Sequence, residues 1–513
     1  MLVKTHGSAV HGVDAITITV EVNVDTGVNF FLVGLADSAV KESHQRIEAA
    51  LKNVGYRIPG KKIVINMAPA DIRKEGAAYD LTLAIGILAA TGQITHNEVD
   101  RFIIMGELSL DGGLKPIRGT LPIAVQALKE GFRGIILPED NAREASIVEG
   151  LEVYGARNIL DVIGFFNNTQ SGMQAITCRP EDYLSQNTHT SDADFSDVKG
   201  QENIKRALEI AAAGGHNIIL IGPPGAGKTM LARRLPTILP PLDLTEALET
   251  TKIHSVAGRL PTGTPLITER PFRAPHHTVS DVALVGGGSY PQPGEISLAH
   301  HGVLFLDELP EFKRAVLEVM RQPLEERMVT ISRARVSVDY PASFMLVASM
   351  NPCPCGFYNH PDKDCVCAPG IVQKYLNRIS GPLLDRIDLH VEVTPVNVSE
   401  LSEDRISEKS AAVRERVIAA RRIQEERFAS SAGIHCNAQM SSKQFRKVCR
   451  VDEEGKQLLN KAMDKLGLSA RAYDRILKVA RTIADLSGSA DIRTEHLSEA
   501  IHYRSLDREG WAG

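Results

Sequence analysis

The sequence has no long hydrophobic run. Its longest apolar stretches fall far short of the roughly 20 residues that a membrane-spanning helix needs. The N-terminal residues Met1–His6 lack the pattern of a secretory signal. We therefore expect a cytoplasmic protein that contacts no membrane. In that compartment its seven cysteines should stay reduced unless they bind a metal.

A strong excess of charge is absent too. The net charge of −5 argues against a uniformly basic surface for nucleic acid, but not against a local basic channel. The sequence shows no heptad pattern, low-complexity tract or tandem repeat. Apolar residues make up 43% and charged residues 24%, as is typical of globular proteins, and the 513 residues suggest about three or four domains.

A glycine-rich stretch lies between a predicted strand and a predicted helix. Residues 222–229 match the phosphate-loop pattern G-x-x-x-x-G-K-[ST], after the apolar run Asn217–Ile221 and before a helical segment that stops at Pro236. The glycines let backbone N–H groups surround a polyphosphate, and the helix N-terminus adds its positive end. The residues expected to contact the nucleotide are Gly222, Pro223, Pro224, Gly225, Ala226, Gly227, Lys228, Thr229 and Met230.

The side chains for ATP hydrolysis come from this loop and from a second strand. Lys228 is expected to reach the β- and γ-phosphates, and the Thr229 hydroxyl to ligate Mg²⁺. The apolar run Gly302–Leu306 ends in two carboxylates. We expect Asp307 to hold the Mg²⁺ through water and Glu308 to polarise the attacking water. ATP with Mg²⁺ is the predicted cofactor.

Three further polar residues have predicted roles in the same reaction. Asn351 follows the predicted strand Phe344–Met350, where an amide can contact the γ-phosphate or order the water. Arg386 lies between apolar runs, which is unusual within one subunit and fits an arginine finger that points into a neighbour's nucleotide site. Arg471 opens a predicted helix near the C-terminus, from which it can reach the γ-phosphate.

Four cysteines form two close pairs, Cys353 with Cys355 and Cys365 with Cys367, separated by nine residues. Two such pairs can supply four thiolates to a tetrahedral Zn²⁺. The C-x-C spacing is tighter than the usual C-x-x-C, and reduced structural thiols or a redox pair are the alternatives.

Two segments between the catalytic strands are candidates for contact with DNA. The glycines of residues 286–288 favour a mobile loop near a ligand or a plain flexible turn. Val329–Val338 is predicted to form a hairpin with Arg333 and Arg335 at or near its tip. Such arginines usually only solvate a turn, but at the pore of a ring they would meet phosphates.

The first 170 residues predict mixed strands and helices. Ala15–Val24 alternates as a strand, and Asp37–Leu51 and Asp80–Ala90 have helical patterns. Several segments resemble the proteolytic domain of Lon-type proteases: Lys74–Thr82, Gly106–Leu110, Leu114–Gly119 and Gly134–Pro138. In that family a lysine activates a serine nucleophile. The resemblance places these two positions at Ala78 and at about Ile123, which carry no reactive group. We predict a Lon-like fold without peptidase chemistry.

Together these residues resemble the ComM/YifB family of magnesium-chelatase-like AAA+ ATPases over nearly the whole chain. The segments specific to that group are Ala211–His216, Phe272–His277, Asn351–Gly356 and Ser380–Asp388. The resemblance implies an α/β protein with a Lon-protease-like α+β domain, an AAA+ parallel-sheet core with pore-loop insertions and a helical lid. Combined with the composition, it predicts a first domain at residues 1–170, a polar linker at 171–194, the core at 195–395 and the lid at 396–513.

The resemblance also implies a function. It implies a hexameric ring that moves along single-stranded and branched DNA and drives branch migration when transforming DNA is integrated by homologous recombination. Recombination proteins are then expected partners. Two alternatives remain. One is a chelatase-like remodeller of a protein partner, although no partner region of the chelatases is present. The other is a Lon-like protease, which Ala78 and Ile123 disfavour.

Overall fold

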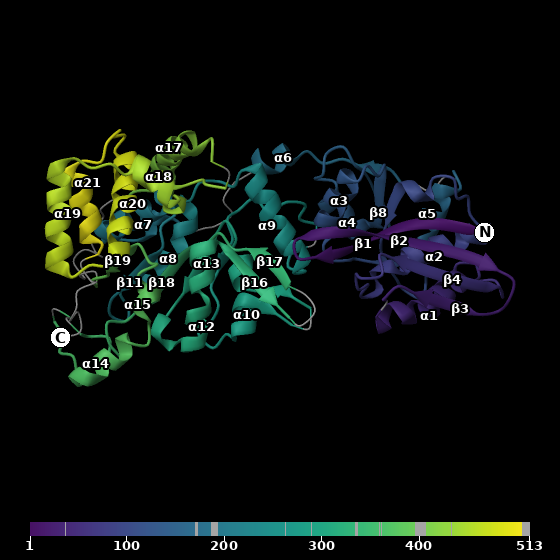
Figure 1. The fold of residues 1–513 in the computed structure, drawn as a ribbon, viewed down its shortest axis with the longest axis horizontal. Helices are drawn as coiled ribbons and strands as arrows, with labels where there is room; N and C mark the ends of the chain where they lie inside the picture. The colour runs from purple at the N-terminus through teal and green to yellow at the C-terminus, as the bar shows by residue number, and fades with distance from the viewer. Residues whose placement is uncertain are drawn as a thin grey trace. The chain divides into compact units, whose positions relative to one another are not determined.

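The computed structural model describes residues 1–35, 37–169, 173–185, 193–261, 263–288, 290–333, 337–358, 360, 362–395, 407–431 and 433–504. The chain divides into two compact units (Figure 1). Unit 1 contains residues 1–187, 243–268 and 332–340, and unit 2 contains residues 188–242, 269–331 and 341–513. Each unit has its own core of buried apolar side chains.

Unit 1 is built on a mixed eight-stranded sheet with the order β10-β9-β8-β5-β1-β2-β4-β3. Its long central hairpin joins β1 to β2 in antiparallel register, Leu2 opposite Asn23. The predicted strand Ala15–Val24 lies within β2, where alternate residues are buried because one face of the sheet packs on the core. The strands are β1 Leu2–His11, β2 Asp14–Asp25, β3 Phe30–Val33, β4 Lys62–Ala68, β5 Phe102–Ile104, β8 Gly134–Pro138, β9 Glu152–Ala156 and β10 Ala175–Ile176, and β6 Glu107–Leu108 pairs separately with β7 Leu114–Lys115.

Several helices of unit 1 pack on this sheet. Helix α2 is buried along its whole length, as its uniformly apolar sequence requires, and it packs on β1 and β2. Helix α9, which the sequence analysis placed within the ATPase core, packs on α3 in this unit. The helices are α1 Ser38–Asn53, α2 Asp80–Ala90, α3 Thr120–Lys129, α4 Glu139–Ala145, α5 Ile159–Phe166, α6 Pro180–Ser185 and α9 Leu244–Val256.

Unit 2 contains a five-stranded sheet with the order β12-β15-β18-β11-β19, and every neighbouring pair is parallel. Strands β11, β15 and β18 are wholly buried, which explains why their sequences are continuous apolar runs and not alternating ones. The strands are β11 Ile218–Ile221, β12 Phe272–Arg273, β15 Val303–Leu306, β18 Met345–Met350 and β19 Leu389–Glu392. A small sheet in this unit pairs β13 Gly286–Gly287 with β14 Gln292–Pro293. A separate two-stranded sheet pairs β16 Met328–Ser332 with β17 Ser337–Pro341.

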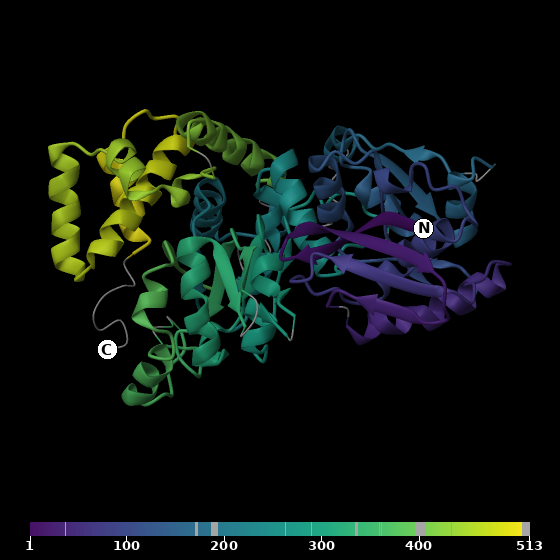
Figure 2. The ribbon, with the colours of Figure 1, turned by 45° about the vertical axis from the view of Figure 1, so that its right-hand side comes forward.

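The helices of unit 2 include a C-terminal group that lies together at one end of the unit (Figure 2). In this group α20 packs against α21, α17 and α7, and the helices α18, α19 and α20 begin after the capping residues Ser441, Asp452 and Ser469. The group consists of α17 Ser410–Phe428, α18 Ser442–Val448, α19 Glu453–Leu466, α20 Ala470–Leu486 and α21 Thr494–His502. The other helices are α7 Glu202–Gly214, α8 Lys228–Arg234, α10 Asp281–Val285, α11 Glu295–Leu298, α12 Arg314–Val319, α13 Arg321–Glu326, α14 Pro369–Leu376 and α15 Gly381–Leu384.

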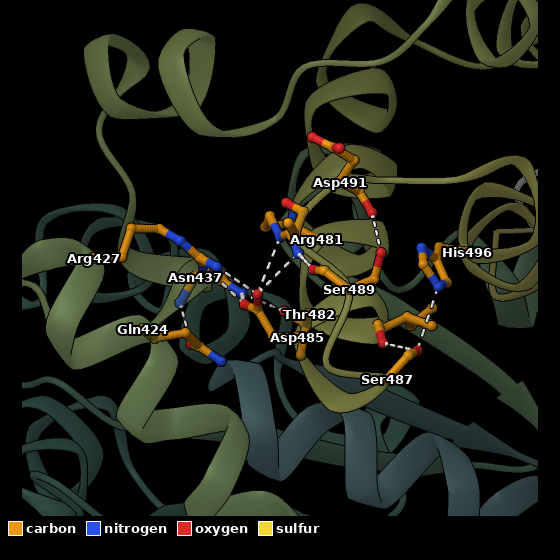
Figure 3. Close-up of polar contacts among 12 residues, drawn as sticks. Gln424, Arg427, Asn437, Arg481, Thr482, Asp485, Ser487, Ser489, Asp491 and His496 are labelled. Atoms are coloured by element: carbon orange, nitrogen blue, oxygen red, sulfur yellow. Dashed lines mark hydrogen bonds and ion pairs between the residues drawn. The ribbon is translucent and has the colours of Figure 1, made fainter.

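A buried polar network holds this helical group together (Figure 3). Asp485 of α20 is fully buried and accepts hydrogen bonds from Arg427 of α17, from Arg481 and from the Asn437 amide at 2.7 Å. The same Asn437 amide also donates a hydrogen bond to the Thr482 hydroxyl at 3.1 Å. Each charge of the network therefore has a partner, which is the condition for burying it without a large cost.

The predicted fold class is confirmed: the chain combines mixed α/β units, a parallel sheet and C-terminal helices. Among the described residues no helix has both the length and the apolar character needed to span a bilayer. The predicted domain boundaries stay predictions.

Candidate functional site

The predicted phosphate loop joins β11 to α8 in unit 2. Its first residue is tied to the neighbouring strand, because the Gly222 N–H donates to the Met350 carbonyl at 3.2 Å. Gly227 precedes α8 with φ of +83°, a left-handed conformation that residues with a Cβ rarely adopt. The loop therefore ends at a helix N-terminus, the arrangement that binds phosphate in other proteins.

Lys228 lies inside the loop. Its Nζ donates to the carbonyls of Gly222 at 2.7 Å and Pro223 at 2.8 Å, and to Oδ1 of Asn351 at 3.1 Å. Burial lowers the pKa of Lys228, and the negative charges of Asp307 and Glu308 oppose this effect. The structure thus brings the loop lysine, the two carboxylates and the amide after β18 into one site.

Thr229 and Asp307 provide adjacent oxygen donors. Thr229 Oγ1 donates to Asp307 Oδ2 at 2.7 Å, and Ser349 donates to the other oxygen, Oδ1. The parallel register explains the second contact, since Leu306 pairs with Ala348 and the next residue on each strand is therefore at the same level. Hydroxyl and carboxylate oxygens are the ligands that Mg²⁺ takes in proteins, so the donor set fits this ion.

Glu308 has an unusual backbone conformation, with φ of +54°. Such strain in a residue other than glycine persists only where surrounding contacts hold it, and it is concentrated at functional sites. Here the Glu308 N–H donates to Asp307 Oδ1 at 3.1 Å, and the carboxylate lies 3.6 Å from Nδ1 of His277. The side chain is 58% exposed, so water can reach it.

The two predicted arginines lie apart from the loop. Arg386 is only 6% exposed, and its guanidinium pairs with Glu325 while Nε has no hydrogen-bond partner among the described residues. It borders a cavity of about 540 Å³, whose other lining residues include Arg321, Glu318 and Val329. Arg471 is exposed at the start of α20, 3.9 Å from Asp385. Within the described part of the chain neither arginine has a hydrogen bond or ion pair with the loop.

The four predicted cysteines do come together. Their sulfurs all lie within 4.8 Å of one another, with Cys353 Sγ 3.3 Å from that of Cys355 and 3.7 Å from that of Cys365. Burial tends to raise the pKa of Cys355, but N–H donors and neighbouring thiols lower it to about 6. A zinc ion at about 2.3 Å from four sulfurs sets them about 3.8 Å apart, so the cluster has the size of a tetrahedral site.

The structure describes only part of the segments that are predicted to contact DNA. Arg333 follows β16 and is exposed, whereas Arg335 lies outside the described residues. The glycine stretch 286–288 begins in the short pair β13–β14.

The positions of the Lon-type dyad hold apolar residues in unit 1. Ala78 lies in a short 3₁₀ helix, Ala77–Tyr79, and Ile123 is 2% exposed inside α3. We expect no cleavage of casein by the purified chain, with or without ATP, because neither position offers a nucleophile or a base. ATP-dependent proteolysis that co-purifies with the chain through every column would contradict this prediction.

Three residues of the site were missed by sequence reasoning. Ser349 is the one polar residue in the wholly buried β18, and that interruption of an apolar run was the available signal. Gln201 donates to the Ala226 carbonyl of the loop at 3.0 Å, and His277 contacts Glu308. His277 ends the segment Phe272–His277 that the family resemblance marks, although no role was predicted for it, and no such signal marks Gln201.

Family models of magnesium chelatase match this chain, and one of them covers the residues of the candidate site. The family profile "Magnesium chelatase, subunit ChlI" matches residues 194–401, "Subunit ChlI of Mg-chelatase" matches 20–141, and "Magnesium chelatase, subunit ChlI C-terminal" matches 407–504. Lon protease 2 of Bacillus subtilis is 34% identical over 28% of this chain and 27% of its own length.

Two relatives cover the whole chain. Competence protein ComM of Haemophilus influenzae is 45% identical over 99% of this chain and 98% of its own length. Uncharacterized protein YifB of Escherichia coli is 45% identical over 98% of this chain and 97% of its own. The chain therefore belongs to the ComM/YifB family of magnesium-chelatase-like AAA+ ATPases.

Proposed function

We propose that this chain is a DNA motor, a ring-forming helicase that couples ATP hydrolysis to branch migration during integration of transforming DNA. The observation that carries the proposal is the 45% identity to a competence protein over nearly the full length of both chains. The ATP site supports it, because Lys228, Thr229, Asp307 and Glu308 lie within one site. Single-stranded and branched DNA are the proposed partners, together with recombination proteins.

The proposed reaction assigns one task to each side chain. Lys228 stabilises the charge on the β- and γ-phosphates. Thr229, and Asp307 through water, would hold Mg²⁺, which would neutralise the developing charge. Glu308 polarises the attacking water from its exposed position, and Asn351 contacts the γ-phosphate or orders that water. Nearby Ser349 and His277 orient the two carboxylates through the contacts they make with them.

The proposed assembly is a homo-hexamer in which Arg386 acts on a neighbour's nucleotide and Arg471 on the γ-phosphate. In the single chain Glu325 pairs with the Arg386 guanidinium. The Nε atom of Arg386 is buried and has no hydrogen bond among the described residues. An incompletely satisfied buried cation is costly. Release of this ion pair on assembly would expose the guanidinium for the neighbouring site.

A Zn²⁺ ion is the third proposed cofactor, after ATP and Mg²⁺. Four thiols within 4.8 Å of one another support it, and the chemistry it supplies is structural, since four cysteines leave no open coordination position. Cys353, Cys355, Cys365 and Cys367 are its proposed ligands.

DNA binding tests the functional proposal. Arg333→Ala together with Arg335→Ala should lower affinity for single-stranded DNA by roughly tenfold or more and reduce DNA-stimulated ATPase, while basal hydrolysis stays near the wild-type rate. Because binding to phosphates releases counterions, the salt dependence of log K should weaken by about 0.7 for each phosphate that the variant no longer neutralises. Fluorescence anisotropy across a salt series and a coupled ATPase assay measure both effects.

The matched control removes the same charge elsewhere. Arg422 of α17 and Arg446 of α18 are both exposed, and their double alanine variant should bind DNA as the wild type does. The wild type should move three- and four-way junctions only with hydrolysable ATP. If DNA neither binds the ATP-loaded chain nor stimulates its ATPase, the motor function is refuted. The alternative is then a chelatase-like remodeller of a protein partner, which the three chelatase profiles favour.

A further inference from the structure

We infer that the cysteine segment, residues 353–367, acts as a clamp, by which we mean that it fixes the conformation of the phosphate loop. This inference rests on the ATP and zinc sites of the proposed function. Zinc bound by this segment would hold the loop in its nucleotide-binding shape. Occupancy of the metal site would then control the affinity for ATP.

The first link runs through the end of β18. The Met350 carbonyl accepts a hydrogen bond from the Gly222 N–H, and Oδ1 of Asn351 accepts one from Lys228 Nζ at 3.1 Å. Cys353 follows two residues later and is wholly buried. The same short stretch of backbone therefore carries a contact to the loop's first residue, a contact to its lysine and the first metal ligand.

A second link is direct packing of the segment on the loop. Gly356 closes a turn in which its N–H donates to the Cys353 carbonyl at 3.0 Å, and its φ is +84°. A Cβ at this position would lie 2.4 Å from Cδ of Pro224, closer than two carbon atoms can approach. The turn between the cysteine pairs thus rests on the phosphate loop itself.

The third link returns from the far side of the segment. Helix α14 begins at Pro369, just after Cys367, and its Tyr375 is only 7% exposed. Burial raises the pKa of the Tyr375 hydroxyl, and the nearby backbone N–H of Asn351 opposes this shift. Helix α14, at the far end of the cysteine segment, therefore places Tyr375 next to Asn351.

Physical reasoning gives the metal a specific task here. The segment between Cys353 and α14 has no strand or helix of its own among the described residues, and thiols alone interact only weakly. A tetrahedral ion replaces those weak contacts by four bonds and removes most of the conformational freedom of the loop they close. Without the ion, the turn at Gly356 and the position of Asn351 should become mobile, and the phosphate loop would lose two of its supports.

The experiment begins with the full-length chain and its metal content. Elemental analysis should find about one zinc per chain, and Cys365→Ser with Cys367→Ser should lose it while Cys178→Ser keeps it. In the zinc-free double variant the dissociation constant of a fluorescent ATP analogue should rise by about tenfold or more. Hydrogen exchange of the peptide covering residues 222–230 should become faster. If the double variant fails to fold, zinc released from the wild type with a reversible mercurial gives the same two readouts.

A glycine pair separates packing from metal binding. Gly356→Ala should keep its zinc but bind the ATP analogue more weakly, because the added Cβ displaces Pro224. Gly467→Ala is the matched control, since its φ of +61° imposes a similar backbone strain but a Cβ there meets nothing within 4 Å. Unchanged ATP affinity and loop exchange in a folded, zinc-free chain would refute the clamp. A purified chain that contains no zinc would refute it too, as would a Gly356→Ala variant that binds ATP as well as Gly467→Ala does. DNA is absent from these assays, so a failure of the motor function would leave their outcome unaffected.

Discussion

Lys228→Ala should abolish ATP turnover, with a loss of at least about 10²–10³-fold, the usual effect of removing a group that stabilises transition-state charge. Binding of the nucleotide should weaken as well. Lys228 Nζ already lies among the loop carbonyls of Gly222 and Pro223, so it is the cation positioned to contact phosphate there. A coupled ATPase assay and equilibrium binding of a fluorescent ATP analogue measure the two losses.

Glu308→Gln separates binding from hydrolysis. The variant keeps the size of the side chain but cannot accept a proton, so binding should persist while turnover falls by about 10²–10⁴-fold. Arg233→Ala, an exposed change on the same helix as Lys228, is the control and should retain both activities. Turnover near the wild-type rate in Glu308→Gln would remove Glu308 from the proposed role.

Mixed assemblies test whether the site is shared between subunits. Arg386→Ala should stop turnover without loss of ATP binding to its own subunit. Mixtures of Lys228→Ala and Arg386→Ala chains can join an intact loop to an intact arginine, so part of the ATPase activity should return. If co-assembled mixtures stay inactive, Arg386 either acts within its own chain or only holds the fold through its pair with Glu325.

Asp485→Ala should produce the largest loss of stability among single changes in the C-terminal helices. Asp485 has a wholly buried side chain and is the shared acceptor of Arg427 and Arg481 (Figure 3). Removing it leaves two charged guanidinium groups without their carboxylate, a change that costs about 3–5 kcal/mol. In a unit of this size that corresponds to a drop of roughly 10 °C in the melting transition.

Local measurements locate this effect. Hydrogen exchange should accelerate across α20 and the segment around Asn437, which donates to Asp485 at 2.7 Å. Asp491→Ala changes an exposed residue of the same region, and its effect should stay within about 0.5 kcal/mol. Equal melting of the two variants would show that the network contributes little to stability.

The amino-acid sequence by itself determined much of the local structure, and it predicts the chemistry of the ATP site. Asp80–Ala90 is helical as predicted because uniform apolarity and helix-forming residues agree there. The starts of the C-terminal helices are marked chemically by residues such as Ser441, Asp452 and Ser469, whose side chains accept hydrogen bonds from the first turn. The phosphate loop is equally readable, because its glycines, lysine and threonine are close together in the chain.

Only the tertiary structure decided which distant residues meet. Strand register placed Ser349 beside Asp307, and no local pattern encodes the register of two parallel strands far apart in the chain. Folding of the cysteine segment brought Gly356 against Pro224, and packing of α13 gave Arg386 its partner Glu325. Such contacts depend on how whole elements pack, and the free energy that selects the packing is summed over many buried side chains and not stored in any one motif.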